Sequence, residues 1–405
     1  MSSARLLSFI LPALCCSSLS AHAADAWSLS NLVGHALAHH PALRSAGHAV
    51  RAEQARSLGA ARWSDPRLVF QVEDLPADDP AWGSAQRTAA LVQEVPGPGK
   101  RGHLRRAAAA RVEQAAVEEQ ALRAALARDV WVAWADAPAA LRRTAAAGEN
   151  RQAAQDLLRI AERGQQAGAW GEAEVLAARA EAEGAALDVQ EAGRRQQQAL
   201  RKLGLLVSAP VEAAQLDPAQ LGTLPVAAAG GESPIFRQAR AELAQRAAAE
   251  RVAQSAAIPD VELSAGLGWA AETGDRLLEF GVGLPLPLFN RRRGAVEGAR
   301  EDRLAAEAAL EAAHAEAAAG AESLRADLAA AQARVEAYGA RLLPLARQSY
   351  AAAERSFEAG RTGWATVLEA RRALARVEAE QIEHLQAWHA AAAGAAYHGI
   401  GSLEN

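Results

Sequence analysis

The chain has 405 residues and a net charge of −5, and only 4% of its residues are aromatic although half are apolar. The negative charge argues against nucleic acid as the main partner. The apolar half is largely alanine, which is poor material for one compact globular core. Alanine instead favours long helices packed closely side by side.

The first 23 residues have the pattern of a secretory signal peptide. A positive charge and a short apolar core precede the cleavage pattern Ala-His-Ala at 21–23. Cys15 and Cys16 are the two cysteines of the chain and lie in this segment. The mature chain is therefore expected to lack thiols, disulfides and thiolate metal sites. Lipidation of Cys15 is the alternative, and it is disfavoured because Leu14 is larger than the residue usually found there.

Past residue 23 the sequence contains no run of eighteen apolar residues, so no transmembrane helix is expected. A membrane-crossing exported chain of this kind must use a closed β-barrel. Alternating patterns predict two pairs of strands, at Pro66–Asp74, Arg87–Val95, Asp260–Trp269 and Leu277–Leu284. Strands of this length span a bilayer when tilted. A half-buried strand of a soluble sheet has the same pattern, and the signal peptide and long helices favour the barrel.

Each strand pair precedes a very long predicted helix. The first runs from the turn at Pro96–Gly102 to Arg163, and the second covers Asn290–Ala359. Pro138 and Pro344 are expected to kink them. The remaining predicted helices are Leu29–His39, Pro41–Trp63, Gly171–Leu206, Pro234–Ala257 and Trp364–Ala396.

Two stretches at helix ends repeat each other. Ala161–Arg179 and Ala353–Arg371 share seven identities besides alanine, namely Glu162/Glu354, Arg163/Arg355, Gly168/Gly360, Gly171/Gly363, Val175/Val367, Leu176/Leu368 and Arg179/Arg371. Two such helical hairpins predict an internally duplicated protein. We divide the mature chain into a first repeat (24–206), a low-order linker or equatorial segment (207–233) and a second repeat (234–405).

The four predicted strands cannot close a barrel alone, and open strand edges are not tolerated in lipid. The chain is therefore expected to oligomerise. Eight strands from a dimer would fill the barrel interior with side chains, whereas twelve from a trimer would leave room for a channel.

The duplicated unit of two strands, long helix, Gly-x2-Gly tip and returning helix resembles the TolC-type outer-membrane efflux protein family. The most specific match is Phe357–Ala370, with a weaker copy at Ala167–Ala178. The resemblance implies a mainly α fold with a transmembrane β-barrel, in which a homotrimer forms a 12-strand β-barrel continued by a 12-helix α-barrel. It implies an outer-membrane channel with a long periplasmic extension, surrounded by outer-membrane lipid, which docks to a periplasmic adaptor and an inner-membrane efflux pump. The short length and the Pro-Gly-Lys-Arg-Gly turn favour the cobalt–zinc–cadmium components, and hence divalent metal cations as cargo.

Family members close the periplasmic end of the tunnel with acidic residues in the pattern Val-Asp-Val-Leu-Asp-Ala. Glu369 matches the second acid, Thr366 replaces the first, and Glu174 takes the first position in the first repeat. Arg361 lies one position before the arginine that ties neighbouring helices together in the family. Clustered carboxylates would repel one another and attract cations, as a gate requires. The alternative is that Glu369 lies on a solvated helix face and pairs with a nearby arginine.

The glycines of the two tips are candidate adaptor-docking residues, because small residues let another helical hairpin approach closely. They are Gly164, Gly168, Gly171, Gly360 and Gly363. The same glycines are also suited to capping helices.

Other functions find little support in the sequence. His35, His39 and His40 are close in sequence, but a partly solvated helix end explains them better than a metal site, so no metal site is predicted. No cofactor is predicted either. Phosphate-binding loops, a cysteine nucleophile and HExxH-type motifs are missing, so an enzyme is not predicted. The alternative function is a soluble periplasmic coiled-coil adaptor or scaffold, for which two hairpins and four strands fit less well.

Overall fold

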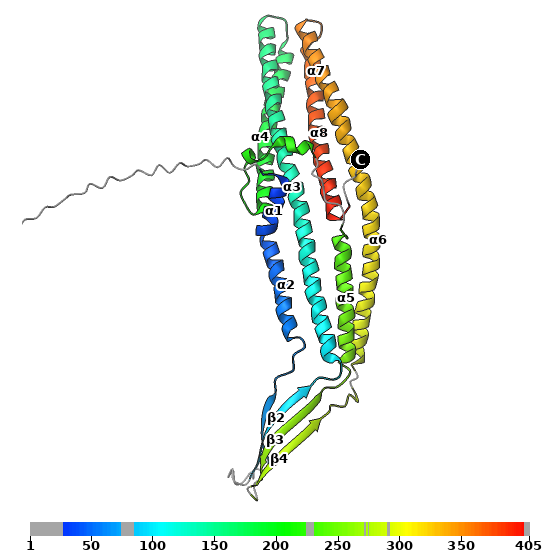
Figure 1. The fold of residues 1–405 in the computed structure, drawn as a ribbon. Helices are drawn as coiled ribbons and strands as arrows, with labels where there is room; N and C mark the ends of the chain where they lie inside the picture. The colour runs from blue at the N-terminus through cyan, green and yellow to red at the C-terminus, as the bar shows by residue number, and fades with distance from the viewer. Residues whose placement is uncertain are drawn as a thin grey trace, which may run out of the picture.

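The computed structural model describes residues 27–73, 85–223, 231–270, 273, 275–289 and 292–400. The predicted signal peptide and both cysteines lie outside these ranges. The molecule is long and narrow, with a small sheet at one end and two helical hairpins at the other (Figure 1). The fold is thus mainly helical, as the sequence predicts.

The sheet has four antiparallel strands in sequence order: β1 (Arg67–Glu73), β2 (Gln86–Val95), β3 (Val261–Trp269) and β4 (Arg276–Gly283). Their bounds agree with the predicted strands to within two residues. The central pairing joins the two halves of the chain, since β2 runs against β3 from Arg87 opposite Trp269 to Val95 opposite Val261.

The register places most large apolar side chains on one face of the sheet. Leu68 lies opposite Leu91, and Leu267 lies opposite Leu278. The apolar members of this face that are more than a third exposed are Leu68, Phe70, Val72, Leu91, Leu263, Leu267, Trp269, Leu278, Phe280 and Val282. The other face carries mainly glycine, serine, threonine and charged residues. An exposed apolar face of this kind marks a surface that contacts lipid or another protein.

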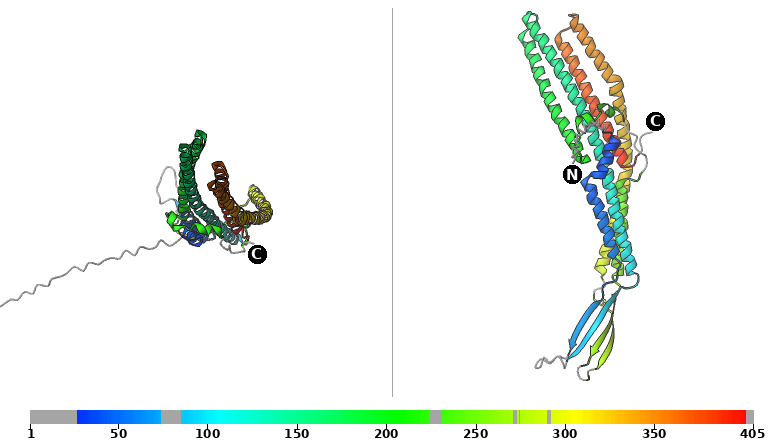
Figure 2. Two further views of the ribbon diagram at one scale, coloured as in Figure 1. Left: turned by 90° about the horizontal axis from the view of Figure 1, so that it is seen from above. Right: turned by 60° about the vertical axis from the view of Figure 1, so that its left-hand side comes forward.

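Helices form two stacked groups above the sheet. The group next to the sheet contains α2 (Pro41–Gly59), the first half of α3 (Lys100–Gln166), α5 (Pro234–Ser255) and α6 (Arg293–Ala337). The far group contains the rest of α3, α4 (Glu172–Val207), α7 (Leu343–Glu358) and α8 (Trp364–Tyr397). α8 packs against α3, so α7, α8, α3 and α4 are neighbours in that order. Viewed from above, these helices follow a curve that is open on one side (Figure 2).

The two prolines inside the long helices lie in different backbone. Pro138 is fully buried within α3, which continues through it as one helix, and the kink expected there stays a prediction. Near Pro344 the helix changes to a π-turn, Tyr338–Leu342, before α7 begins. A proline disturbs the backbone one turn before it, and a wider turn there relieves the clash.

A polar clamp connects the sheet to the helices. Lys100 Nζ lies 2.7 Å from Asp260 Oδ1 and 2.8 Å from Oδ2, and the Gly97 amide donates to Oδ1 at 2.8 Å. A side chain at Gly97 would press on Ile258 at 3.0 Å. The Pro-Gly-Lys-Arg-Gly turn of the first half is therefore fastened to the start of β3 in the second half.

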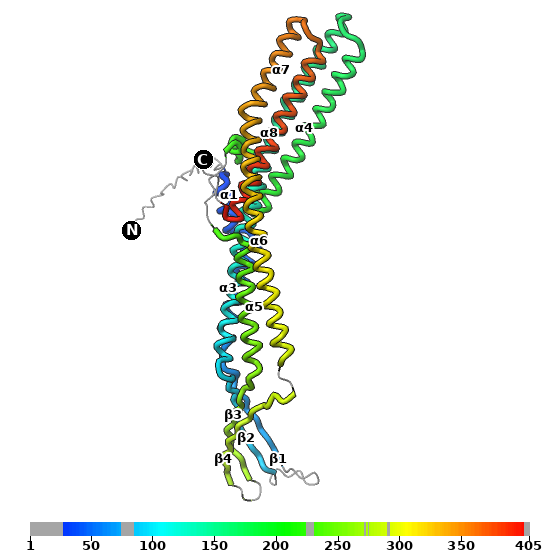
Figure 3. The backbone as a smooth tube through the Cα atoms, turned by 90° about the vertical axis from the view of Figure 1, so that its right-hand side faces the viewer, coloured from blue at the N-terminus to red at the C-terminus, as the bar shows by residue number. Residues whose placement is uncertain are grey.

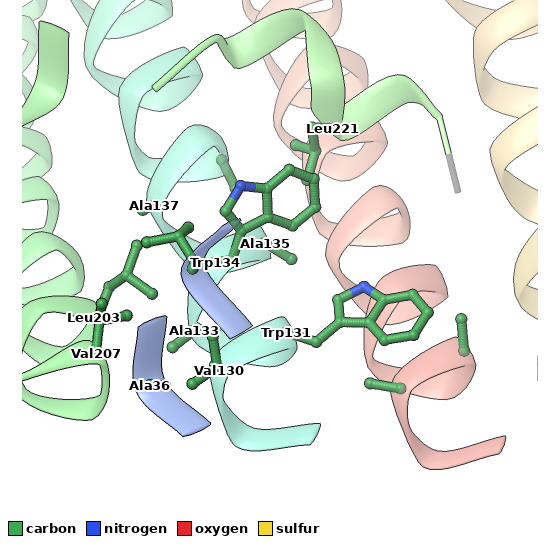
Figure 4. Close-up of a cluster of buried hydrophobic side chains, with 14 of the residues drawn as sticks. Ala36, Val130, Trp131, Ala133, Trp134, Ala135, Ala137, Leu203, Val207 and Leu221 are labelled. Atoms are coloured by element: carbon green, nitrogen blue, oxygen red, sulfur yellow. The ribbon is translucent and has the colours of Figure 1, made fainter. Parts of the chain in front are cut away.

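The main hydrophobic core lies half-way along the molecule, where α1 (Leu29–His39), α3, α4 and α8 meet (Figure 4). Two short 3₁₀ turns, Ala213–Gln215 and Pro218–Gly222, cover it. Leu216 and Leu221 insert from this segment and are almost fully buried. Residues 208–223 are thus ordered by packing, contrary to the prediction of a low-order linker.

His389 is fully buried in this core and joins three elements. Its Nδ1 accepts a hydrogen bond from Trp131 Nε1 at 3.1 Å, so its Nε2 carries the proton and donates to the Leu221 carbonyl at 3.1 Å. Burial lowers the pKa of His389, and the bond to Leu221 opposes this effect only partly. The neutral ring therefore connects α3, α8 and the 3₁₀ turn.

Among the described helices, none combines the length and apolar character needed to cross a membrane.

Candidate functional site: the paired helical tips

The two helical tips lie side by side at the end of the molecule opposite the sheet (Figure 1, Figure 3). Each tip ends its first helix in the same way, with a glycine in the left-handed conformation at φ 73° (Gly168) and 68° (Gly360). A Schellman pair of hydrogen bonds closes each turn. The bond of each pair that spans more residues runs from Ala169 N to Gly164 O in the first tip and from Arg361 N to Ser356 O in the second, at 2.9 Å in both.

The other tip glycines have separate tasks. Gly171 and Gly363 are the N-caps of α4 and α8, with extended backbone and no side-chain cap. Gly164 is required by packing, because a Cβ atom there would lie 2.9 Å from the Trp170 ring. All five predicted tip glycines thus have structural roles, and adaptor docking stays a prediction.

An aromatic cluster, which we call the tip bridge, connects the two tips. Trp170 of the first tip lies with its ring centroid 6.1 Å from Phe357 at the end of α7 and 6.2 Å from Trp364 at the start of α8. Such spacing is typical of stabilising aromatic pairs. The sequence prediction missed this cluster, although three aromatic residues in the duplicated stretches of a chain so poor in them were a signal.

One ion pair forms a second bridge between the hairpins, further from the tips. The Arg372 guanidinium on α8 donates two hydrogen bonds to the Glu181 carboxylate on α4, one of them at 3.2 Å. This bond raises the pKa of Arg372, with a smaller contribution from Glu369. Arg372 therefore pairs mainly with Glu181, not with Glu369 as the alternative interpretation proposed.

The repeated Glu–Arg positions differ between the hairpins. In the first hairpin, Arg179 and Glu162 approach to 3.6 Å. In the second, Arg371 lies over the ring of Tyr350 at 5.4 Å. Burial, together with a hydrogen bond to Glu354, raises the pKa of Tyr350 to about 12. Identical sequence positions are thus used differently in the two hairpins.

Packing between the hairpins is incomplete. An open cavity of about 270 Å³ lies between α3, α4 and α8, with Asn150, Glu181, Leu368 and Arg371 among its lining residues. The hairpins share the main core at their bases, and this cavity interrupts the packing between them nearer the tips. Such an arrangement permits relative movement of the tips when the contacts between them break.

The predicted gate residues lie near the tips. Thr366 and Glu369 are exposed on the first turns of α8, and Arg361 is exposed in the second tip. Glu174 is half-buried on α4, and its carboxylate lies 3.0 Å from where a Cβ of Gly171 would be. Nothing in the described residues joins Glu174 to Glu369, so their action together stays a prediction.

The histidines near the N-terminus have structural partners. His35 Nδ1 lies 3.0 Å from the Val207 carbonyl, and His39 Nδ1 lies 3.0 Å from the His35 carbonyl. His40 caps α2 by accepting from the Ala42 amide at 3.2 Å. Over the described ranges, no group of three or more His, Cys, Asp or Glu side chains is arranged to hold a metal ion.

Comparison with known proteins decides the family. The family model for outer membrane efflux proteins matches residues 32–208 and 227–394. The chain belongs to the outer membrane efflux protein family. This membership favours the channel of an efflux system, located in the outer membrane, over the periplasmic adaptor or scaffold.

Two relatives and one solved structure extend the comparison. The chain is 32% identical to the nickel-cobalt-cadmium resistance protein NccC of Alcaligenes xylosoxydans xylosoxydans, covering 72% of this chain and 68% of that protein. It is 31% identical to the nickel and cobalt resistance protein CnrC of Cupriavidus metallidurans, covering 72% and 71%. A membrane protein from Pseudomonas aeruginosa shares the fold with a TM-score of 0.76 at 22% identity, covering 98% of this chain and 99% of that one.

Proposed function

We propose that this outer-membrane efflux protein is a passive export duct formed by three copies of the chain. Four strands from each copy would close a 12-strand barrel, and the far helices would continue it as a 12-helix periplasmic tunnel. The observation that carries the proposal is the sheet: its apolar face is exposed, and its edge strands β1 and β4 have no further partner among the described strands. Lipid-exposed edges must be paired, and further copies of the chain provide the pairing.

The helices support the same assembly. α4 lies at the end of the curved row of helices and packs mainly on α3. Leu176, Leu187 and Leu205 of α4 are more than half exposed, although the repeat counterpart of Leu176, Leu368, is buried. The face of α4 that carries these leucines is therefore suited to the open end of the row in the next copy.

Divalent metal cations are the proposed cargo. NccC and CnrC carry nickel, cobalt or cadmium resistance in their names, and the chain covers more than two thirds of each. In this proposal a periplasmic adaptor docks at the tips, an inner-membrane pump supplies the driving force, and the duct itself binds no resident metal. The two repeats (24–206 and 234–405) each contribute one hairpin and one strand pair.

The test is to measure oligomeric mass and planar-bilayer conductance in one detergent-extracted preparation. A trimer with small, cation-selective conductance steps is the expected result. A protein that needs no detergent and conducts no current would overturn the proposal, because the four strands would then not be a barrel wall.

Within this duct, Glu369 is the proposed gate residue. Replacing it with glutamine is expected to lower the ratio of cation to anion permeability roughly threefold to tenfold at low salt. Three carboxylates about 8 Å from a permeating ion contribute roughly 0.5 kcal/mol each in a water-like dielectric, and salt screens them. Reversal potentials in a salt gradient measure the effect.

The matched control is Glu322→Gln, which removes an exposed carboxylate from α6 far from the tips. Selectivity that stays the same in Glu369→Gln would refute the gate assignment and leave the channel assignment intact.

A further inference from the structure

The segment 284–289 extends the apolar stripe of β4 beyond the end of the strand. Leu284, Leu286 and Leu288 continue the two-residue spacing of Leu278, Phe280 and Val282. Pro285 and Pro287 alternate with them, and because proline has no N–H the hydrogen-bonded ladder ends at Gly283. The three leucines are each at least half exposed, and Phe289 is fully exposed.

The equivalent segment of the first half provides an internal comparison. There, glycines replace the leucines in Pro96-Gly-Pro-Gly, and the basic residues that follow make contacts within the protein. Lys100 is paired with Asp260, while Arg101 donates to the Ala61 carbonyl at 2.8 Å. The first copy of this loop is therefore folded against the protein, whereas the second copy exposes its apolar side chains.

Basic residues follow the exposed apolar segment. Arg292 and Arg293 are exposed at the start of α6, and Arg292 is the N-cap with a left-handed φ of 53°. Serine, threonine, aspartate and asparagine are the usual N-caps, and the positive end of the helix dipole disfavours cations. The first turn of α6 also contains no acidic residue. The arginines therefore do not stabilise the start of α6.

We infer that residues 284–289, together with Arg293, form a lipid-binding collar in the periplasmic leaflet of the outer membrane. The leucines and Phe289 would enter the boundary of the acyl chains, and Arg293 would contact phosphate groups of anionic phospholipids. The inference rests on the proposed membrane position of the sheet. Lipid is the proposed ligand because the exposed stripe is continuous with the apolar face of β4 and is followed by cations.

The collar also explains why the apolar stripe is longer than the strand. From residue 278 to residue 286 an extended chain rises about 26 Å. β4 provides more than half of this distance, Leu284 and Leu286 provide the rest, and the chain then bends where the Leu288 N–H donates to the Leu286 carbonyl at 2.8 Å. The collar would anchor the barrel at the level where the strands leave the membrane and the helices begin.

The test uses single spin labels on the full-length mature protein in vesicles of phosphatidylethanolamine and phosphatidylglycerol. Cysteines replace Leu288 in the collar, Val282 in β4 and Ser323 on α6. At Leu288 and Val282, the collision rate with oxygen is expected to exceed that with a water-soluble nickel chelate severalfold. Ser323 is expected to show the reverse.

Each other outcome has a definite meaning. A label at 288 that the nickel chelate reaches freely, with 282 still in lipid, would overturn the collar and leave the proposed channel standing. A label at 288 shielded from both reagents would also overturn it, because a second copy of the chain would then cover the segment. A label at 282 in water would overturn the membrane position of the sheet.

A second measurement tests the basic part of the collar. Spin-labelled phosphatidylglycerol is expected to associate with the protein more strongly than phosphatidylcholine, and Arg293→Gln is expected to reduce this preference about fivefold. Arg325→Gln, which removes an exposed arginine further along α6, is the control and should leave the preference unchanged. An equal preference in Arg293→Gln and the unmodified protein would overturn the headgroup contact.

Discussion

Replacing Trp170 with alanine is expected to shift the closed channel toward the open state by about tenfold in each copy of the chain. Trp170 makes both inter-tip aromatic contacts, to Phe357 and to Trp364. Each such pair is worth roughly 0.5–1.5 kcal/mol, and about 1.4 kcal/mol changes an equilibrium tenfold. Between the main core and the tips the packing of the hairpins is interrupted by a cavity, so losing the tip bridge removes a large part of what joins their ends. Single-channel recording of open probability and conductance measures the shift.

Two further variants define the cause of this effect. Gly164→Ala should act in the same direction, because its Cβ would lie 2.9 Å from the Trp170 ring and displace it. Gln166→Ala removes an exposed polar side chain from the end of α3 in the same tip and should not change the open probability. Unchanged gating in both Trp170→Ala and Gly164→Ala would show that the tip bridge does not hold the closed state.

The parts of the fold that local chemistry determines were predictable from the sequence. Glycine spacing placed both tips, since a left-handed turn needs a residue without Cβ at positions such as Gly168 and Gly360. The alternation of apolar residues with polar or small residues predicted the positions of all four strands. Long alanine-rich stretches predicted α3 and α6, because helix propensity adds up over many residues.

The parts that depend on distant contacts were not predictable. The tip bridge joins residues from opposite halves of the chain, and nothing local to Trp170 shows what it will meet. Residues 208–223 look like a loop, and only the buried Leu216 and Leu221 show that they are held against the core. The sequence predicts a kink at both prolines, yet Pro138 lies within a continuous packed helix and Pro344 follows a π-turn.

The largest stability effect is expected at His389, which no sequence motif indicated. In His389→Ala, the Trp131 N–H and the Leu221 carbonyl would lose their partners beside a new cavity. Unpaired buried groups and a cavity together reduce the free energy of unfolding by about 3–5 kcal/mol. Loss of helical circular dichroism on heating in detergent measures the change. Glutamine at this position can both donate and accept, and should recover a large part of the stability.

The same residue makes stability depend on pH in a defined direction. Because burial lowers the pKa of His389 in the folded protein, its stabilising effect is complete above the unfolded pKa of about 6.5 and is lost as pH falls toward the lower folded value. Protonation would put two N–H groups, those of His389 and Trp131, against each other. His389→Gln is expected to flatten the fall in melting temperature below about pH 6.5, whereas the exposed His48→Gln should preserve it. If both variants keep the same acid-induced loss, another group is responsible, and the three-element junction at His389 does not control the acid stability of the duct.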